Sequence, residues 1–259
     1  MRYFLKLAYN GAPFHGWQSQ PNAISIQSTI EDAVTKILRE KIAIVGAGRT
    51  DTGVNAREMY AHFDFDRDIK DKKKFILSLN SMVGKDIGIE EIIIVDKDAH
   101  ARFDATERTY KYFVSFKKNA FQKEYSWKSP SFLNIDLMNQ AADILKQTKD
   151  FTSFAKLHSD AKTNFCDVRV AEWQYIEKDK EAFEFIGNLD NGIVFTITAD
   201  RFLRNMVRAI VGTLIEVGRG KMSLSQFKDV IDKKNRSSAG TSMPAHALFL
   251  WRVKYPFIH

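Results

Sequence analysis

Apolar residues recur with two different periods along this chain of 259 residues. Segments with an apolar residue at every second position indicate strands, and spacings of three and four indicate helices. The expected elements do not follow the strict strand–helix–strand order of a parallel sheet, and several neighbouring strands are placed to form hairpins. The pattern therefore favours an α+β fold with a largely antiparallel sheet over a doubly wound parallel one.

The expected elements divide into two similar groups. In the first group, strands are expected at 2–9, 41–45, 59–65 and 87–95, with helices at 26–38 and 72–82 and a capping box at 28–31. In the second group, strands are expected at 109–116, 169–176, 182–186, 193–199 and 247–253, with helices at 137–145, 202–217 and 224–231. We therefore predict two α+β halves, residues 1–105 and 106–259, that meet in one long sheet.

Composition restricts the class of protein. Hydrophobic residues make up 44% and charged residues 27%, as in a globular protein, and the net charge of +7 favours a polyanionic partner. Cys166 is the only cysteine, so no disulfide framework or thiolate metal cage is expected. The N-terminal residues lack the apolar core of a signal peptide, and no apolar run reaches membrane-spanning length. We expect a cytoplasmic protein without a membrane partner.

A glycine-bracketed turn, Gly48–Val54, is the first candidate for chemistry. It holds a guanidinium, Arg49, which can grip a phosphate, and a carboxylate, Asp51, two residues further on. An aspartate in such a turn often only accepts backbone hydrogen bonds. A dinucleotide-binding loop is disfavoured because Asp51 stands where the third glycine belongs, and no Gly-Lys-Ser/Thr follows to make a phosphate-binding loop.

The second candidate is a strand with two tyrosines. Tyr110 and Tyr112 share one face of the expected strand, which is usual in a core but also makes a platform on which a flipped RNA base can stack. Arg102, Arg108 and Lys111 flank this platform, and we expect them to contact phosphates. Their positive charge favours RNA binding over a purely structural role for this strand.

The third candidate is the basic side of the long helix expected at 202–217. Arg201, Arg204 and Arg208 follow spacings of three and four, so we expect them to line one side. For Arg201 and Arg204 the alternative is an ordinary solvated basic face. Arg208 lies among apolar residues, where a guanidinium needs a carboxylate partner, and Asp51 is a candidate for that partner. The histidines show no metal-ligand spacing.

Five short motifs occur in order, each weak alone and specific as a set. They are Phe14–Gln18 with Ser25–Gln27, Gly46–Val54, His100–Phe103 with Arg108–Tyr112, Asp150–Phe154, and Phe202–Arg208 with Val217–Gly220. On these motifs, over nearly its whole length, the chain resembles the TruA family of tRNA pseudouridine synthases.

The resemblance implies the pseudouridine synthase fold, with helices on one side of the shared sheet. It implies conversion of uridine to pseudouridine at positions 38, 39 and 40 of the tRNA anticodon stem-loop, without cofactor or metal, by a homodimer. Asp51 would be the catalytic carboxylate, Tyr110 would pack on the target base, and Arg208 would pair with Asp51. Arg49 would displace the uridine from its helix, and Arg102, Arg201 and Arg204 would add RNA contacts.

Two residues depart from the family pattern, which usually reads Asp-Ala-Gly-Val-His. This chain has Thr52 for the alanine and Asn55 for the histidine. Because Asp51, Tyr110 and Arg208 all remain, we expect activity. The alternatives are a pseudouridine synthase with a shifted RNA target and a tRNA-binding protein without catalysis.

Overall fold

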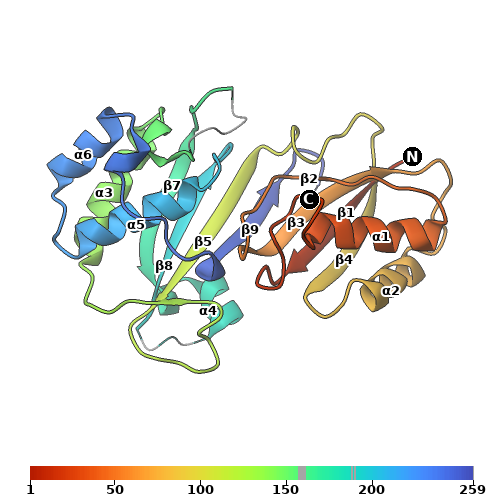
Figure 1. Cartoon of the computed structure of the whole chain (residues 1–259), viewed down its shortest axis with the longest axis horizontal. Helices are drawn as coiled ribbons and strands as arrows, with labels where there is room; N and C mark the ends of the chain where they lie inside the picture. The colour runs from red at the N-terminus through yellow and green to blue at the C-terminus, as the bar shows by residue number, and fades with distance from the viewer. Residues whose placement is uncertain (157–161, 188, 190, 259) are drawn as a thin grey trace. The chain divides into compact units, whose positions relative to one another are not determined.

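The computed structural model describes residues 1–156, 162–187, 189 and 191–258 (Figure 1). The chain divides into two compact units. The first unit comprises Met1–Glu107 together with Leu250–His259, and the second comprises Arg108–Phe249. The residues that follow Leu250, which we expected in the second half, cluster with the first unit. The division into two halves at residues 1–105 and 106–259 stays a prediction.

The first unit is built on an antiparallel sheet. Strand β1 (Arg2–Tyr9) pairs with both β3 (Asn55–Asp64) and β4 (Ile87–Val95), with Leu5 opposite Ala61 on one side and Ile92 on the other. The short β2 (Val45–Gly46) and β9 (Leu248–Lys254) are further neighbours of β3. Helices α1 (Ile26–Leu38) and α2 (Lys72–Met82) pack together, and α2 packs against β4.

Strand β1 is buried on both faces. Tyr3 stacks on Phe63 with ring centroids 5.4 Å apart, whereas Phe4 meets the edges of Tyr255 and Phe257 at 5.4 and 5.8 Å. Tyr3 and Phe4 are both 0% exposed. A strand covered on both faces needs apolar residues at consecutive positions, and the C-terminal residues supply the second cover.

The strand predicted at 41–45 is wrong, because only Val45–Gly46 pairs as a strand. The amide of Ile42 donates to the Thr35 hydroxyl (3.1 Å) and that of Ile44 to the Glu31 carboxylate (2.9 Å). Side chains of α1 therefore take the donors that a strand would need. The capping box also lies earlier than predicted, at Ser25 and Ser28.

The second unit is a separate α+β arrangement. Strand β8 (Ile193–Ala199) pairs antiparallel with β5 (Glu107–Ser115) and β7 (Val168–Tyr175), and β6 (Trp127–Lys128) pairs in parallel with β5. Helix α3 (Ile135–Gln147) packs on β7 and on α5 (Met206–Gly218), and it also contacts α6 (Leu224–Asp232). The described residues of this unit also form the short helix α4 (Lys180–Ile186) and 3₁₀ turns at Thr152–Phe154, Ile176–Lys178, Arg236–Ser238 and Ala245–Ala247.

The strand predicted at 182–186 is wrong, because these residues belong to helix α4. Asp179 caps the helix by accepting the amide of Ala182, and Gly187 ends it with a φ of 71°. Ala182 and Ile186, four residues apart, form its buried side. The helix has only 7 residues, so its apolar positions are too few for the helical period to be recognised in the sequence.

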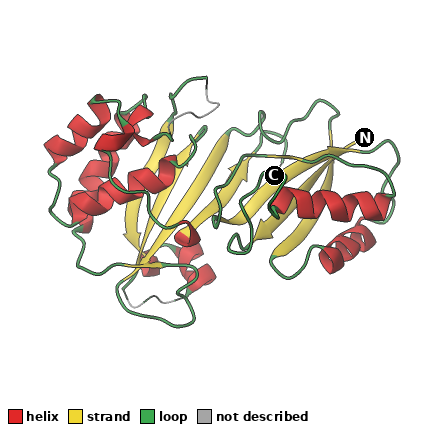
Figure 2. Cartoon of the chain, viewed as in Figure 1, coloured by secondary structure: helices red, strands yellow, loops and turns green. Residues whose placement is uncertain are grey.

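The predicted α+β class is confirmed, and antiparallel pairing dominates in both units (Figure 2). Apart from those named above, the predicted elements are present with ends shifted by a few residues. Within the described part of the chain, no helix combines the length and apolar character needed to span a bilayer.

Candidate active site

Asp51 lies in the turn between β2 and β3. The amide of Val54 donates to the Asp51 carbonyl at 3.1 Å and closes the turn. Gly53 has a φ of 77°, a left-handed conformation that favours glycine. Asp51 is half-buried, and its neighbours Arg49 and Thr52 are exposed. The turn therefore holds its backbone rigidly while Asp51 keeps contact with solvent.

The loop that follows β1 contains Gly11 and Gly16, and its backbone packs directly against the backbone of the Asp51 turn. A Cβ placed on Gly11 would lie 2.1 Å from the carbonyl oxygen of Val54. Gly16 has a φ of 86°, and a Cβ there would lie 2.6 Å from the carbonyl oxygen of Thr50. No residue but glycine permits these two approaches, so the loop braces the Asp51 turn at both ends.

Two side-chain hydrogen bonds join the loop and the turn. The amide of Gly11 donates to Oδ1 of Asn55 at 2.8 Å, and the hydroxyls of Tyr9 and Thr50 lie 2.9 Å apart. Asn55 is 1% exposed. A buried backbone N–H without an acceptor costs about 1–3 kcal/mol, so the amide oxygen at position 55 stabilises the turn. Asn55 thus keeps a structural hydrogen bond, and Thr52 lies on the exposed side of the turn.

Tyr110 lies on β5 in the second unit, opposite Ile197 of β8. Its ring meets the edge of Phe202 with centroids 5.1 Å apart, and the residue is half-buried. Tyr112, on the same face, is 0% exposed, and its hydroxyl has no hydrogen-bond partner among the described residues. The two tyrosines therefore differ: Tyr112 belongs to the core, and Tyr110 keeps contact with solvent.

Lys111 was expected to contact phosphate, and this prediction is wrong. It is 5% exposed on the opposite face of β5, where its ammonium pairs with the carboxylate of Asp179. Asp179 also caps α4. The ion pair thus attaches that helix to the sheet. Arg108 donates to the carbonyl oxygen of Asp200 at 2.8 Å.

Arg208 lies in the first turn of α5 and is half-buried. Its Nε donates to the carbonyl oxygen of Met243 at 2.6 Å, and the amide of Met243 donates to the carbonyl oxygen of Arg208 at 3.1 Å. Burial raises the pKa of the nearby Tyr112, and the positive charge of Arg208 acts in the opposite direction. The guanidinium is therefore oriented by a backbone carbonyl far away in the sequence.

The residues before Met243 lie across α5. A Cβ on Gly212 would be 1.8 Å from the carbonyl oxygen of Thr241, and the amide of Gly240 donates to the hydroxyl of Thr213 at 2.9 Å. We call this segment, residues 240–243, the α5 strap. The glycine in the middle of the helix lets the strap approach closely enough to reach Arg208.

The prediction that three arginines line one side of a helix is wrong. Helix α5 begins at Met206, because Asn205 before it has a φ of 65°. Arg201 and Arg204 therefore precede the helix, with Arg204 exposed and Arg201 half-buried. Only Arg208 lies on α5.

The predicted site residues are divided between the two units. Arg49 and Asp51 share one turn of the first unit, which also carries the exposed Arg102 in the turn after β4. The second unit carries those that remain, namely Tyr110, Arg201, Arg204 and Arg208. Sequence reasoning missed two supporting groups, the Asn55 amide and the Met243 carbonyl. The Asn55 amide could have been found from the sequence, because Asn55 is a polar residue directly after the turn. The Met243 carbonyl could not, because it is a main-chain atom.

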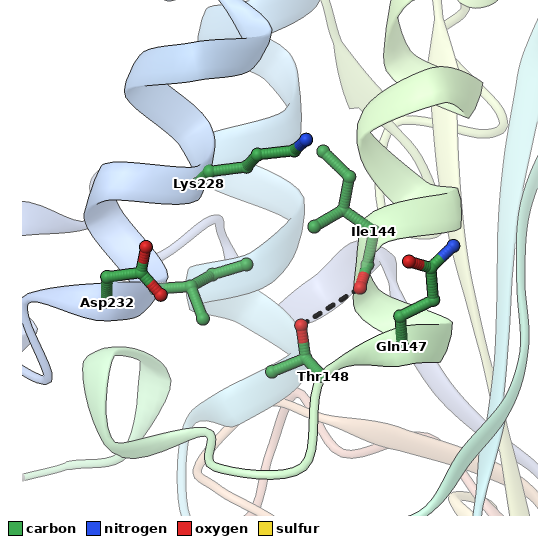
Figure 3. Close-up of a pocket in the computed structure, with 6 residues that line it drawn as sticks. Ile144, Gln147, Thr148, Lys228 and Asp232 are labelled. Atoms are coloured by element: carbon green, nitrogen blue, oxygen red, sulfur yellow. Dashed lines mark hydrogen bonds between the residues drawn. The ribbon is translucent and has the colours of Figure 1, made fainter.

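A shallow pocket of about 210 Å³ lies elsewhere in the second unit, between α3 and α6 (Figure 3). It is lined by Ile144, Gln147, Thr148, Lys228, Ile231 and Asp232. The Thr148 hydroxyl donates to the carbonyl oxygen of Ile144 at 2.9 Å, as the dashed line shows. None of the predicted site residues lines this pocket, so we assign it no catalytic role.

The described residues contain no group of three His, Cys, Asp or Glu side chains arranged to hold a metal ion. Two of the six histidines, His158 and His259, lie outside the described residues.

Comparison with known proteins gives consistent findings. A sequence profile described as tRNA pseudouridine synthase matches residues 141–256. A protein of Parabacteroides distasonis named tRNA pseudouridine synthase A is 50% identical over 255 residues, which are 98% of this chain and 96% of that protein. Proteins of the same name from Bacteroides fragilis and Bacillus pumilus are 49% and 34% identical, covering 98% of this chain and 96% and 99% of their own lengths.

Proposed function

This chain belongs to the tRNA pseudouridine synthase family, and we propose on that premise that it isomerises uridine to pseudouridine in the anticodon stem-loop of tRNA. The target uridines are those at positions 38, 39 and 40. The reaction breaks the C1′–N1 glycosidic bond, turns the detached base and joins C5 to C1′; C5 then loses its proton and N1 gains one. It is an isomerisation, so atoms and charge balance without a second substrate.

Asp51 is the catalytic carboxylate in this proposal. It attacks C1′ as a nucleophile, or removes a proton at the 2′ position as a base; uracil with its charge delocalised is a tolerable leaving group for either route. The observation that carries the proposal is the bracing of the Asp51 turn by Gly11, Gly16 and Asn55. A carboxylate needs such a fixed backbone to meet one carbon atom of a sugar, since small displacements are costly in rate.

Tyr110 and Arg208 take the supporting roles. Tyr110, half-buried at the edge of Phe202, packs on the free base and keeps it from escaping while it turns. Arg208, oriented by the Met243 carbonyl, pairs with Asp51 and keeps it ionised. Arg49 occupies the space that the flipped uridine leaves, which offsets part of the few kcal/mol that flipping costs.

The finer properties of the protein also belong to this proposal. Arg102, Arg201 and Arg204 contact the RNA backbone, so binding weakens steeply as salt is raised. The protein acts as a cytoplasmic homodimer and needs neither metal nor cofactor. The net charge of +7 supports the polyanionic partner.

The test is the formation of pseudouridine in an unmodified tRNA transcript with EDTA present. Asp51→Asn should yield no detectable product while it still binds tRNA, because it keeps the shape and removes the charged oxygen. Asp66→Asn is the control, since the Asp66 side chain is 80% exposed in the same unit. Product at the wild-type level from Asp51→Asn would contradict the catalytic assignment.

A second measurement separates the proposal from its alternatives. Mapping pseudouridine in total RNA with and without the protein identifies the target positions. Sites outside positions 38 to 40 would indicate a shifted target, and tRNA binding without any modified base would indicate a binding protein.

A further inference from the structure

The turn after β4 displays an aromatic side chain to solvent. Phe103 is 73% exposed, and it directly follows the exposed Arg102, whose guanidinium carbon lies 5.6 Å from the centroid of the Phe103 ring. A side chain this exposed adds little to the core. The pair offers a flat ring and a positive charge on the same turn.

Hydrogen bonds hold this turn in a fixed shape. Nδ1 of His100 accepts the amides of Arg102 (3.1 Å) and Phe103 (3.3 Å). Asp104 closes the turn twice, because its carboxylate accepts the amide of His100 at 2.7 Å and its own amide donates to the His100 carbonyl at 3.0 Å. The ring and the guanidinium are therefore displayed from a rigid backbone.

The turn is also fixed to the sheet beneath it. The amide of Ala101 donates to Nδ1 of His62, a residue of β3 that is 4% exposed, at 3.1 Å. The rings of His62 and His100 meet edge to face with centroids 4.7 Å apart, and His100 lies 4.3 Å from the ring of Phe103. The rings of His62 and His100 thus connect the buried strand to the exposed Phe103. Displaying Phe103 in this way costs little ordering entropy on binding.

We propose that Phe103 is a stacking site for an unpaired base of the tRNA, with Arg102 contacting the adjoining phosphate. The inference rests on the proposed function and adds a contact outside the reacting nucleotide. Stacking on an aromatic ring suits RNA loops, whose bases are splayed out, and a neighbouring arginine suits the phosphate that each base carries. The charge of Arg102 and the net charge of +7 favour RNA over an apolar partner.

A second copy of the chain fits this turn less well. A stable protein interface buries about 800 Å² on each partner, with a central apolar core. Around Phe103 the neighbours in sequence that are exposed are Arg102 and Thr106, which are charged and polar. The turn is therefore suited to a single stacked base.

The experiment compares tRNA affinity and kinetics for three variants at one salt concentration, with an unmodified tRNA transcript as the probe. Phe103→Ala should weaken binding about tenfold and raise KM by a similar factor, with kcat unchanged. Phe103→Trp should bind as tightly as wild type, because the stacking surface remains. Phe121→Ala is the matched control, since Phe121 is 94% exposed in the other unit.

The outcomes are distinct. Phe103→Ala with wild-type affinity and KM, in a protein that forms pseudouridine, would overturn this inference and leave the proposed function intact. A tenfold loss of tRNA affinity in a protein that forms no pseudouridine would support the stacking site and refute the proposed function. A change in sedimentation mass with unchanged tRNA affinity would overturn the inference, because it would make Phe103 part of a protein interface.

Discussion

The Asp51 turn and the first turn of α5 each hold one charged residue of the proposed site, but they hold it in different ways. Around Asp51 the contacts are made to the main chain: Gly11 and Gly16 press against the backbone, and Asn55 ties the loop to the end of the turn. Arg208 is held through its own side chain, by the carbonyl oxygen of Met243.

The difference follows from the two side chains. Aspartate has a short side chain with few rotamers, so a rigid backbone is enough to aim its carboxylate. Arginine has a long side chain with high rotamer entropy, and only a hydrogen bond near its end aims it. Substitutions that disturb the backbone should therefore be more harmful beside Asp51 than beside Arg208, whereas the orientation of Arg208 should depend on the chemistry of its own side chain.

Among the substitutions that test this comparison, the largest effect is expected for Gly11→Ala. The new Cβ would lie 2.1 Å from the carbonyl oxygen of Val54, so loop and turn must move apart. We expect a loss of about 1–3 kcal/mol in the free energy of unfolding and of about a hundredfold in kcat, because the carboxylate is displaced from the sugar. Urea unfolding and single-turnover pseudouridine formation measure the two quantities.

Gly88→Ala is the control for this substitution, since nothing lies within 4 Å of a Cβ at that position on β4. If Gly11→Ala retained full activity while losing stability, the bracing of the turn would have no part in catalysis, and the comparison with α5 would fail.

Arg208→Lys should have a smaller effect on rate and almost none on stability. Lysine keeps the charge, but it has a single side-chain nitrogen, which cannot both donate to the Met243 carbonyl and make the proposed pair with Asp51. We expect kcat to fall about tenfold to thirtyfold, which is about 1.4–2 kcal/mol and lies at the lower end of the range for a hydrogen bond to a charged group, with an unchanged melting temperature. Wild-type kcat for Arg208→Lys would show that charge alone suffices there.

The effect that bears least on the rate is a pH dependence of stability in the first unit. Burial, followed by the charge of Arg2, lowers the pKa of His62 to about 4, and burial also lowers the pKa of His100. Their ordinary value is near 6.5, so between about 4 and 6.5 the unfolded chain binds more protons than the folded one. The stability that these neutral histidines contribute is complete above about 6.5 and is lost as the pH falls toward 4.

Hydrogen exchange at pH 7 and pH 5 tests this expectation. Amides of the turn after β4 and of the neighbouring part of β3 should lose protection at pH 5, whereas those of α5 should not. Equal loss of protection in both units would contradict the role of the two histidines.

The sequence predicted the α+β class and most elements because burial imposes regular periods on strands such as β1 and helices such as α3. It failed where a local contact overrides the period. Ile42 and Ile44 donate their amides to side chains of α1, residues 182–186 have a helical cap at Asp179, and Asn205 delays the start of α5.

The candidate site was predictable to the extent that chemistry is carried by side chains. Asp51 was indicated by its glycine-bracketed turn and Arg208 by its apolar neighbours. The burial of Lys111 beneath α4 was not predictable, because it depends on an ion pair with Asp179, 68 residues away. The Met243 carbonyl was not predictable either, since every residue has one and only the fold selects it.

The hydrogen bond between Gly11 and Asn55 has a consequence for how related sequences are compared. What position 55 must supply is an acceptor for one N–H, and a ring nitrogen of histidine is as valid an acceptor as an amide oxygen. Asparagine and histidine can therefore both fill this position, whereas leucine or alanine would leave the Gly11 amide without an acceptor. A sequence comparison that counts only identical residues would mark position 55 as divergent, although either residue can accept the hydrogen bond from the Gly11 amide.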